Sequence, residues 1–278
     1  MDAVVTSLHL HPVKGLRGFP VSAVAVEPCG FSGDRRWMVV DHGGRFISQR
    51  ELPAMARVVV EPRAGGLFLH YAGVDGIAVA VPRADAAQIE VTVWRSTLPA
   101  ADAGDAAADW LSAVLDTACR LVYLADPNAR AVDPTYGAEN DRVSFADGFP
   151  VLLAAEGSLD DLNRRLRHPV PMRRFRPNLV IGGPAAWAED HWRRIRIGEV
   201  VFRLPKPCSR CVVTTVDQET GERPDPREPL RTLASFRRAE GGVMFGQNMI
   251  PETVGRIAVG DAVQVLEAGA SNVIPIRP

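Results

Sequence analysis

The chain has 278 residues, enough to bury the core of one large domain or of two modest domains, and we expect two. Lys and Arg together number 32 against 33 Asp and Glu, which leaves a formal net charge of -1 and an isoelectric point near 6.6. This balance excludes a global electrostatic field of the kind that recruits nucleic acid or an anionic membrane.

The N-terminal residues and the cysteines indicate the compartment. The first residues carry an early acid, Asp2, and no basic segment ahead of an apolar one, and no uninterrupted apolar stretch reaches about 18 residues. Without an export signal, a disulfide framework is not expected, and a reducing cytoplasm suits the four cysteines, which are Cys29, Cys119, Cys208 and Cys211. We therefore expect a cytoplasmic protein without a membrane segment.

Short strands dominate the expected structure of the first hundred residues. Apolar and β-branched residues predict a first strand over 4–10, and a basic, glycine-containing loop at 11–18 ends it. Residues 36–49 have the pattern of a hairpin around a turn at 42–44. Further strands are predicted over residues 21–26, 57–61, 67–71, 77–81 and 89–94.

The apolar spacing changes at residue 100. Residues 100–115 are rich in alanine and can present apolar side chains on one face, which predicts a helix that begins a second domain. A second helix is expected to begin at Ser158, followed three positions later by Asp161, and a third spans 228–237. A polar loop is expected over 126–141. Strands are predicted over residues 121–124, 151–154, 179–181, 195–204, 212–216 and 262–266.

These elements predict a mainly β protein of the α+β class, built from two β-rich, barrel-like units with a few helices. We assign residues 1–98 to an N-terminal β-rich domain, residues 99–270 to a β-barrel domain and residues 271–278 to a tail.

Cys208 and Cys211 are the first candidates for functional atoms. They lie three residues apart, where a basic, proline-containing loop is expected to become a strand. Lys206 and Arg210 favour a thiolate, the species that attacks substrates or binds soft metals. The spacing alone leaves several alternatives open: half of a structural zinc site, a redox dithiol, a single metal ligand with a spare neighbour, or two buried small side chains.

Three cations stand at strand ends, next to glycines or proline. Lys14 and Arg35 lie beside glycine-containing turns, and Arg176 precedes Pro177 and a predicted strand. Three such cations suit a phosphate or another anion. The neighbouring basic run at 164–167 is better explained as the solvated face of a helix.

Five motifs together resemble one family over nearly the whole chain. They are Pro-Val-Lys-Gly at 12–15, Asp-Arg-Arg-Trp-Met-Val-Val-Asp at 34–41, Phe-Arg-Pro-Asn at 175–178, Lys-Pro-Cys-Ser-Arg-Cys at 206–211 with Thr-Thr-Val-Asp at 214–217, and Phe-Gly-Gln-Asn at 245–248. In this order they resemble the MOSC proteins. The similarity is to the branch with an N-terminal MOSC β-barrel domain, which includes the mitochondrial amidoxime reducing component and its bacterial relatives.

The resemblance implies a molybdenum-molybdopterin cofactor whose metal takes Cys211 as its one protein ligand. It further implies that Cys211, Asp147 and Asn178 are the catalytic residues and that Cys208 has no assigned role. The residues implied to bind or lie close to the cofactor are Lys14, Gly15, Arg35, Asp147, Gly148, Phe149, Arg176, Ser209, Arg210 and Cys211.

The activity implied is the reduction of N-hydroxylated substrates such as amidoximes or hydroxylamines. No four-cysteine iron–sulfur pattern is present, so the electrons are expected from a separate ferredoxin, flavodoxin or flavin reductase. An alternative within the same family is a carrier that delivers molybdenum cofactor or sulfur. A nucleic-acid-binding module using the basic cluster from Arg164 to Arg176 is disfavoured by the near-neutral charge and the lack of a matching motif.

Overall fold

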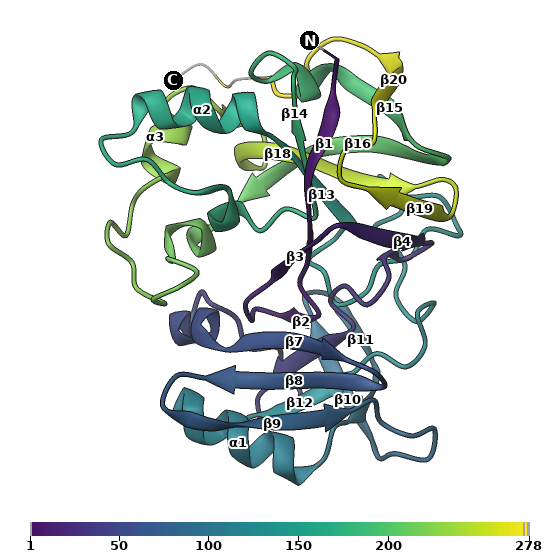
Figure 1. The fold of residues 1–278 in the computed structure, drawn as a ribbon, viewed down its shortest axis with the longest axis vertical. Helices are drawn as coiled ribbons and strands as arrows, with labels where there is room; N and C mark the ends of the chain where they lie inside the picture. The colour runs from purple at the N-terminus through teal and green to yellow at the C-terminus, as the bar shows by residue number, and fades with distance from the viewer. Residues whose placement is uncertain (1, 275, 277–278) are drawn as a thin grey trace.

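The computed structural model describes residues 2–274 and 276 and consists mostly of strands, which confirms the predicted mainly β, α+β class. In Figure 1 two β-rich halves are stacked along the long axis. The first half of the chain forms β1 Val4–Leu10, β2 Val13–Lys14, β3 Phe19–Val21, β4 Ala23–Glu27, β5 Gly30–Phe31, β6 Trp37–Val40, η1 Pro53–Arg57, β7 Val59–Arg63, β8 Gly66–Tyr71, β9 Val74–Ala80, β10 Gln88–Val93, β11 Ser96–Asp102, α1 Asp105–Leu115 and β12 Arg120–Tyr123.

The second half contains the longest strands and two of the helices. Its elements are β13 Val151–Ala155, α2 Glu156–Arg165, η2 Met172–Phe175, β14 Leu179–Gly182, η3 Ala188–His191, β15 Trp192–Ile197, β16 Val200–Arg210, η4 Val212–Thr215, α3 Leu230–Ala234, β17 Arg238–Ala239, β18 Gly242–Pro251, β19 Gly255–Ala258 and β20 Val263–Ala268.

The strand order interleaves the two halves of the chain. One sheet runs β20-β15-β16-β18-β13-β14-β1-β3, so the first strand of the chain pairs with β14 in the upper half of Figure 1. A second sheet runs β10-β11-β12-β6-β2, and β7-β8-β9 forms a third beside α1. The chain therefore passes from the upper half to the lower half immediately before Lys14.

Apolar clusters hold these sheets together, and three of them connect different elements of the fold. One joins the large sheet to β4 and β5 and includes Leu8, Phe31 and Phe202. A second cluster packs α1 against the lower sheets. A third cluster lies beneath α2 and α3. Full burial of each large apolar side chain contributes about 1.5–3 kcal/mol.

The domain division expected at residue 98 stays a prediction. β11 spans that position and β12 follows it, yet both continue the sheet of β10 and β6, and α1 packs with the lower half. Of the tail expected over 271–278, residues 275, 277 and 278 lie outside the described residues.

Several predicted boundaries are wrong. The helix expected from residue 100 begins at Asp105, because Ala100 and Ala101 are buried members of β11 that pair with β10. The helix expected from Ser158 begins at Glu156, and the Ser158 hydroxyl is used in tertiary contacts rather than as a cap.

Other errors lie in the second half of the chain. Residues 195–204 form parts of two strands that turn at Gly198, whose φ of 55° lies in the left-handed region that favours glycine. Residues 212–216, expected to be a strand, contain the 3-10 turn η4, and the long strand β18 was not predicted.

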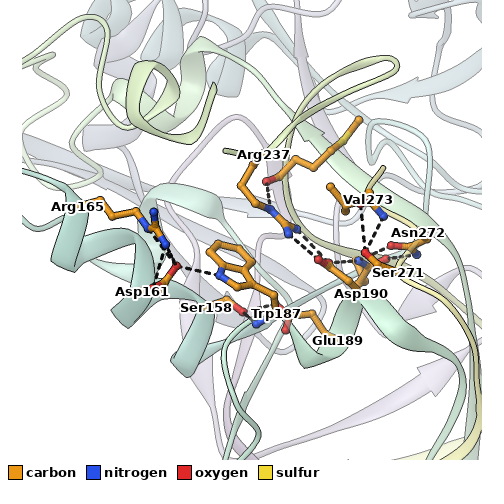
Figure 2. Close-up of polar contacts among 12 residues, drawn as sticks. Ser158, Asp161, Arg165, Trp187, Glu189, Asp190, Arg237, Ser271, Asn272 and Val273 are labelled. Carbon is orange, nitrogen blue, oxygen red and sulfur yellow. Dashed lines mark hydrogen bonds and ion pairs between the residues drawn. The ribbon is translucent and has the colours of Figure 1, made fainter. Parts of the chain in front are cut away.

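A buried polar network holds the back of β18 (Figure 2). Gln247 of β18 donates to Asp190 Oδ1 at 2.8 Å, and Arg237 forms a bidentate pair with the same carboxylate at 2.6 and 3.0 Å. Asn272 and Gln247 exchange two amide hydrogen bonds at 2.9 and 3.1 Å. The next residue, Asn248, lines a cavity on the other face of β18, so this network fixes the strand behind that cavity.

Glu189 lies beside this network and is 1% exposed. Its Oε1 accepts from the Ser158 hydroxyl at 2.6 Å, while Oε2 has no hydrogen-bond partner among the described residues. Burial raises the pKa of Glu189 to about 7; the hydrogen bond from Ser158 opposes this rise and the nearby Asp190 carboxylate adds to it. Arg237, which is engaged by Asp190, only weakly favours the ionised form.

The raised pKa predicts a pH-dependent stability. Between the ordinary value of 4.5 and about 7, the folded chain binds more protons at Glu189 than the unfolded chain does. The free energy of unfolding should therefore fall as pH rises through this window, by on the order of 3 kcal/mol at most, and level off above it. Urea denaturation across the window should show a flatter dependence for Glu189→Gln. The exposed control Glu267→Gln should keep the parent's slope, and equal slopes for parent and Glu189→Gln would contradict the assignment.

Candidate functional site

A cavity between the two halves gathers residues from distant parts of the sequence. Its empty volume is about 830 Å³ including the open mouth. Such clefts between domains are common ligand sites. The lining residues are Lys14, Gly15, Arg35, Phe46, Ser48, Gln49, Arg50, Ala146, Asp147, Gly148, Phe149, Leu152, Phe175, Arg176, Asn178, Cys208, Arg210, Cys211, Val213 and Asn248.

All but one of the site residues predicted from the sequence line this cavity. Those brought together are Lys14, Gly15, Arg35, Asp147, Gly148, Phe149, Arg176, Asn178, Arg210 and Cys211. Ser209 is the exception. Successive side chains of a strand point to opposite faces, so Cys208 and Arg210 face the cavity while the Ser209 hydroxyl donates to the Gly241 carbonyl at 2.8 Å.

The two cysteines lie where a strand ends, not where one begins. Cys208 lies near the C-terminal end of β16. Cys211 follows the strand in an extended conformation, immediately before η4. The carbonyl of Cys211 accepts from the amide of Thr214 at 3.1 Å and from its hydroxyl at 3.0 Å. The Cys211 backbone is thereby fixed, while its sulfur has no hydrogen-bond partner among the described residues and lines the cavity.

Cys208, a candidate from the sequence to which the resemblance assigns no role, lines the same cavity. Its sulfur accepts a hydrogen bond from the guanidinium of Arg210 at 2.9 Å, and the same guanidinium donates to the Phe175 carbonyl at 2.6 Å. The Arg210 guanidinium therefore hydrogen-bonds to the sulfur of Cys208 and not to that of Cys211. A strand over 200–210 would have indicated this, because residues 208 and 210 then share a face.

The sequence motifs did not mark a further group of lining residues as part of a site. Phe46, Ser48 and Gln49 were expected in the second strand of a hairpin, and Arg50 was expected just after it, but only isolated bridges form at residues 45 and 46. The chain instead turns under the cavity and presents these side chains to it. Gln49 donates to the Gly15 carbonyl at 2.7 Å, which ties this segment to the end of β2.

Lys14 is a buried cation with fixed partners. Its ammonium donates to the Phe145 carbonyl at 2.8 Å and to Asp147 Oδ1 at 2.5 Å, and it lies 5.0 Å from the centre of the Phe46 ring. Burial lowers the pKa of Lys14, and the carboxylate of Asp147 opposes that effect.

Asp147 is the solvent-exposed partner of this ion pair. Its side chain is 65% exposed, against 8% for Lys14. Enclosure within the site would raise the pKa of Asp147, but the charges of Lys14 and Arg50 outweigh it and lower the pKa. Because solvent reaches the carboxylate, both effects are screened. Asp147 is ionised at neutral pH.

Arg35 and Arg176 share an unusual backbone conformation. Their φ angles are 47° and 52°, in the left-handed region where a side chain is unfavourable by roughly 1–2 kcal/mol. Such strained positions concentrate at functional sites. The guanidinium of Arg35 donates to Asp34 at 2.5 Å and to Asn178 Oδ1 at 2.9 Å, and Arg176 donates to Gln218 at 3.1 Å.

The cavity has a strong excess of positive charge. Five cationic side chains line it, Lys14, Arg35, Arg50, Arg176 and Arg210, and among the described lining residues Asp147 is the acid. Burial and then the charge of Arg35 lower the pKa of Arg176 to about 9, which still leaves it cationic at neutral pH. An anion bound here would relieve the repulsion between these groups.

The residues fit a metal cofactor that carries an anionic tail. Cys211 supplies a soft sulfur donor that can bind the metal. The cations elsewhere in the cavity lining supply a site for the anionic tail. Gly15 has a φ of 85°, and a Cβ there would lie 2.8 Å from Met55 Cε, so the chain needs glycine where it turns beneath the cavity.

Two features are absent from the described part of the chain. Within residues 2–274 and 276, no group of three or more His, Cys, Asp or Glu side chains is arranged to hold a metal ion by itself. Over the same residues, no helix is both long enough and apolar enough to cross a bilayer.

Comparison with known families agrees with this architecture. The family described as the MOSC N-terminal beta barrel domain matches residues 2–118, and the MOSC domain family matches residues 140–264. Together the two matches define the class as a MOSC protein with both domains.

Curated relatives refine this result. Mitochondrial amidoxime-reducing component 1 is 33% identical in Homo sapiens over 281 residues and 32% identical in Mus musculus over 280 residues. Each match covers 94% of this chain and 82% of the relative. Molybdenum cofactor sulfurase of Oryza sativa subsp. japonica is 31% identical over 267 residues, which cover 88% of this chain but 32% of that protein. The chain belongs to the MOSC family that contains the mitochondrial amidoxime-reducing components.

Asn178 provides a test of how the cations are held. Its buried side chain accepts from Arg35 at 2.9 Å and from the Leu152 amide at 3.2 Å, and donates to the His9 carbonyl at 3.3 Å. Asn178→Ala should lower the free energy of unfolding by about 2 kcal/mol, because buried donors and an acceptor lose their partner. Urea denaturation measures this. Asn128→Ala, in the polar loop, should change stability by less than about 0.5 kcal/mol, and equal effects of the two substitutions would contradict the bridging role.

Proposed function

We propose that this protein is a molybdenum cofactor-dependent reductase of N-hydroxylated substrates such as amidoximes and hydroxylamines. One observation carries the proposal: the thiol of Cys211 shares a cavity with Lys14, Arg35 and Arg176, cations that come from both halves of the sequence. The names of the relatives, amidoxime-reducing component and molybdenum cofactor sulfurase, support the same molybdenum-related class.

In this proposal the chain's own residues divide the task of holding the cofactor. Cys211, as thiolate, is the protein ligand of the metal, because molybdenum favours soft sulfur. Lys14, Arg35 and Arg176 hold the anionic tail. Gly148 leaves room for the cofactor beside Asp147, since a Cβ at Gly148 would meet no atom within 4 Å.

The reaction consumes two electrons and two protons: the N–O bond breaks, the amidoxime becomes an amidine, and the hydroxyl oxygen leaves as water. When bound, the cofactor supplies the two-electron chemistry that breaks this bond. The electrons are proposed to come from a separate protein, a ferredoxin, a flavodoxin or a flavin reductase, in the cytoplasm.

Asp147 and Asn178 have different proposed roles. Asp147 is ionised and exposed at the cavity, so it can accept hydrogen bonds from the N–H groups of an amidoxime and attract the cationic amidine product. Asn178 is a positioning residue, because its amide is already engaged by Arg35, Leu152 and His9.

A second candidate function is the delivery of molybdenum cofactor or sulfur. The observation that favours it is Cys208, a second thiol in the same cavity. A sulfur carrier would need a thiol that accepts and releases sulfur, whereas a reductase needs a metal that stays bound. This chain covers about a third of the rice sulfurase, so the activity of that whole protein does not transfer to it.

Paired cysteine variants distinguish the two candidates. Cys211→Ala should bind less molybdenum than the parent and lose all measurable reduction of benzamidoxime to benzamidine, because the metal loses its protein ligand while the cations still hold the anionic tail. Cys208→Ala should keep its molybdenum. Elemental analysis of the purified proteins and chromatography of benzamidine provide the two measurements. A fully loaded parent that does not reduce benzamidoxime would remove the reductase proposal, and a Cys211→Ala variant that retains metal and turnover would remove the assigned ligand.

A further inference from the structure

Trp94 is an exposed aromatic residue at the edge of the cavity. It is the first residue of the two-residue loop that joins β10 to β11, in the lower half of Figure 1. Its ring lies 5.1 Å from that of Phe46 and 4.5 Å from the guanidinium carbon of Arg50, and its indole N–H donates to Asp147 at 3.2 Å. All three of these contacts line the cavity, yet 44% of Trp94 remains exposed.

The backbone at Trp94 is unfavourable for a large side chain. Its φ is 57°, and tight two-residue hairpin loops place glycine, asparagine or aspartate at such positions. Arg35 and Arg176, which line the cavity, are also non-glycine residues with positive φ. A bulky residue that is strained and exposed at the same time indicates a role outside the fold itself.

The orientation of Trp94 is held by its surroundings. The indole is bonded to Asp147, which pairs with Lys14, and one face is covered by Arg50. Arg130 ties the hairpin to the segment of Asp147, because its guanidinium donates to the Ser96 hydroxyl at 3.2 Å and to the Asp147 carbonyl at 2.9 Å. These contacts hold the ring beside three residues that line the cavity, although Trp94 is not itself part of the lining.

A second exposed aromatic residue contacts another part of the cavity wall. Tyr136, 37% exposed, lies edge-on to Phe149 at 5.9 Å, and Lys206 lies 4.3 Å from the centre of its ring. Phe149 lines the cavity. Among the large exposed hydrophobic side chains of residues 2–274 and 276, Trp94 and Tyr136 are the aromatic ones. The cavity thus has a cationic lining and exposed aromatic side chains in contact with two of its lining residues, Phe46 and Phe149.

We propose that Trp94 is a specificity-determining residue that binds the flat, conjugated body of a substrate while the N-hydroxyl group enters the cationic interior. The inference rests on the proposed reductase function. Aromatic faces bind flat conjugated groups better than they bind small aliphatic groups. Trp94 therefore favours aryl over alkyl N-hydroxylated compounds.

Substrate selectivity in cofactor-loaded protein tests this role. The measurement is the ratio of kcat/KM for benzamidoxime to that for acetamidoxime, in the parent, Trp94→Gly and Trp94→Phe. Trp94→Gly should lower the ratio by about tenfold, mainly through a higher KM for benzamidoxime, and Trp94→Phe should keep most of it. Glycine suits the backbone of this loop, so the Tm of Trp94→Gly should not fall below that of the parent. A folding defect would then not explain the loss.

Binding provides a readout that needs no turnover. The chain has five tryptophans, and benzamidoxime should quench part of their fluorescence in oxidised, cofactor-loaded protein without reductant. Trp94→Phe should lose most of this quenching. The matched control Trp110→Phe should retain it, because the Trp110 indole lies on α1 and donates to the Asp75 carbonyl at 2.6 Å, outside the cavity lining.

The outcomes separate this inference from the proposed function. An unchanged selectivity ratio in Trp94→Gly would overturn the inference while leaving the reductase intact. If the selectivity ratio is unchanged and the KM for the electron-donor protein rises, Trp94 is a docking residue for that donor. That result would also overturn the specificity role. Benzamidoxime binding that depends on Trp94 in a loaded protein without turnover would support the inference and refute the reductase.

Discussion

The structure depends on holding several like charges close together in one cavity. Lys14, Arg35 and Arg176 repel one another, and burial adds a cost that lowers the pKa of Lys14 and of Arg176. Each cation is therefore fixed by its own acceptors: Asp147 and a carbonyl for Lys14, Asp34 and Asn178 for Arg35, and an amide for Arg176. An anion among them turns this repulsion into attraction, so the cavity is prepared for a negatively charged group.

The interleaved topology explains how these groups meet. β1 belongs to the large sheet, and the chain then crosses to β2, which brings Lys14 to the boundary between the halves. β16 carries the cysteines to the same boundary and pairs with β18. On the front of β18, Asn248 donates to the Pro207 carbonyl at 3.2 Å, while on its back Gln247 is held by Asp190. The position of the thiols thus depends on polar contacts far from the cavity.

Much of the fold follows from local pattern, and the site follows from it only in part. Local pattern predicts β1 and β8 closely. Burial alternates along the first part of β8, whereas β1 buries Val5 and Leu8, three positions apart across a bulge. The start of α1 was misplaced because alanine at 100 and 101 suits a helix locally but is held in β11 by pairing with distant strands. The family motifs contain half of the residues that line the cavity, including Cys208, but the resemblance assigns Cys208 no role and no motif contains Trp94. The orientation of Cys208 depends on the pleat of β16, and the position of Trp94 depends on the β10–β11 turn.

The central claim is that Cys211 contributes one sulfur to a metal held in this cavity. X-ray absorption at the molybdenum edge tests it most directly, because sulfur and oxygen neighbours of the metal are resolved by distance and scattering. Compared with the parent, Cys208→Ser should keep the same sulfur neighbours, and Cys211→Ser should lose one sulfur neighbour from whatever metal it retains. An unchanged sulfur shell in Cys211→Ser, or a sulfur lost in Cys208→Ser instead, would contradict the account.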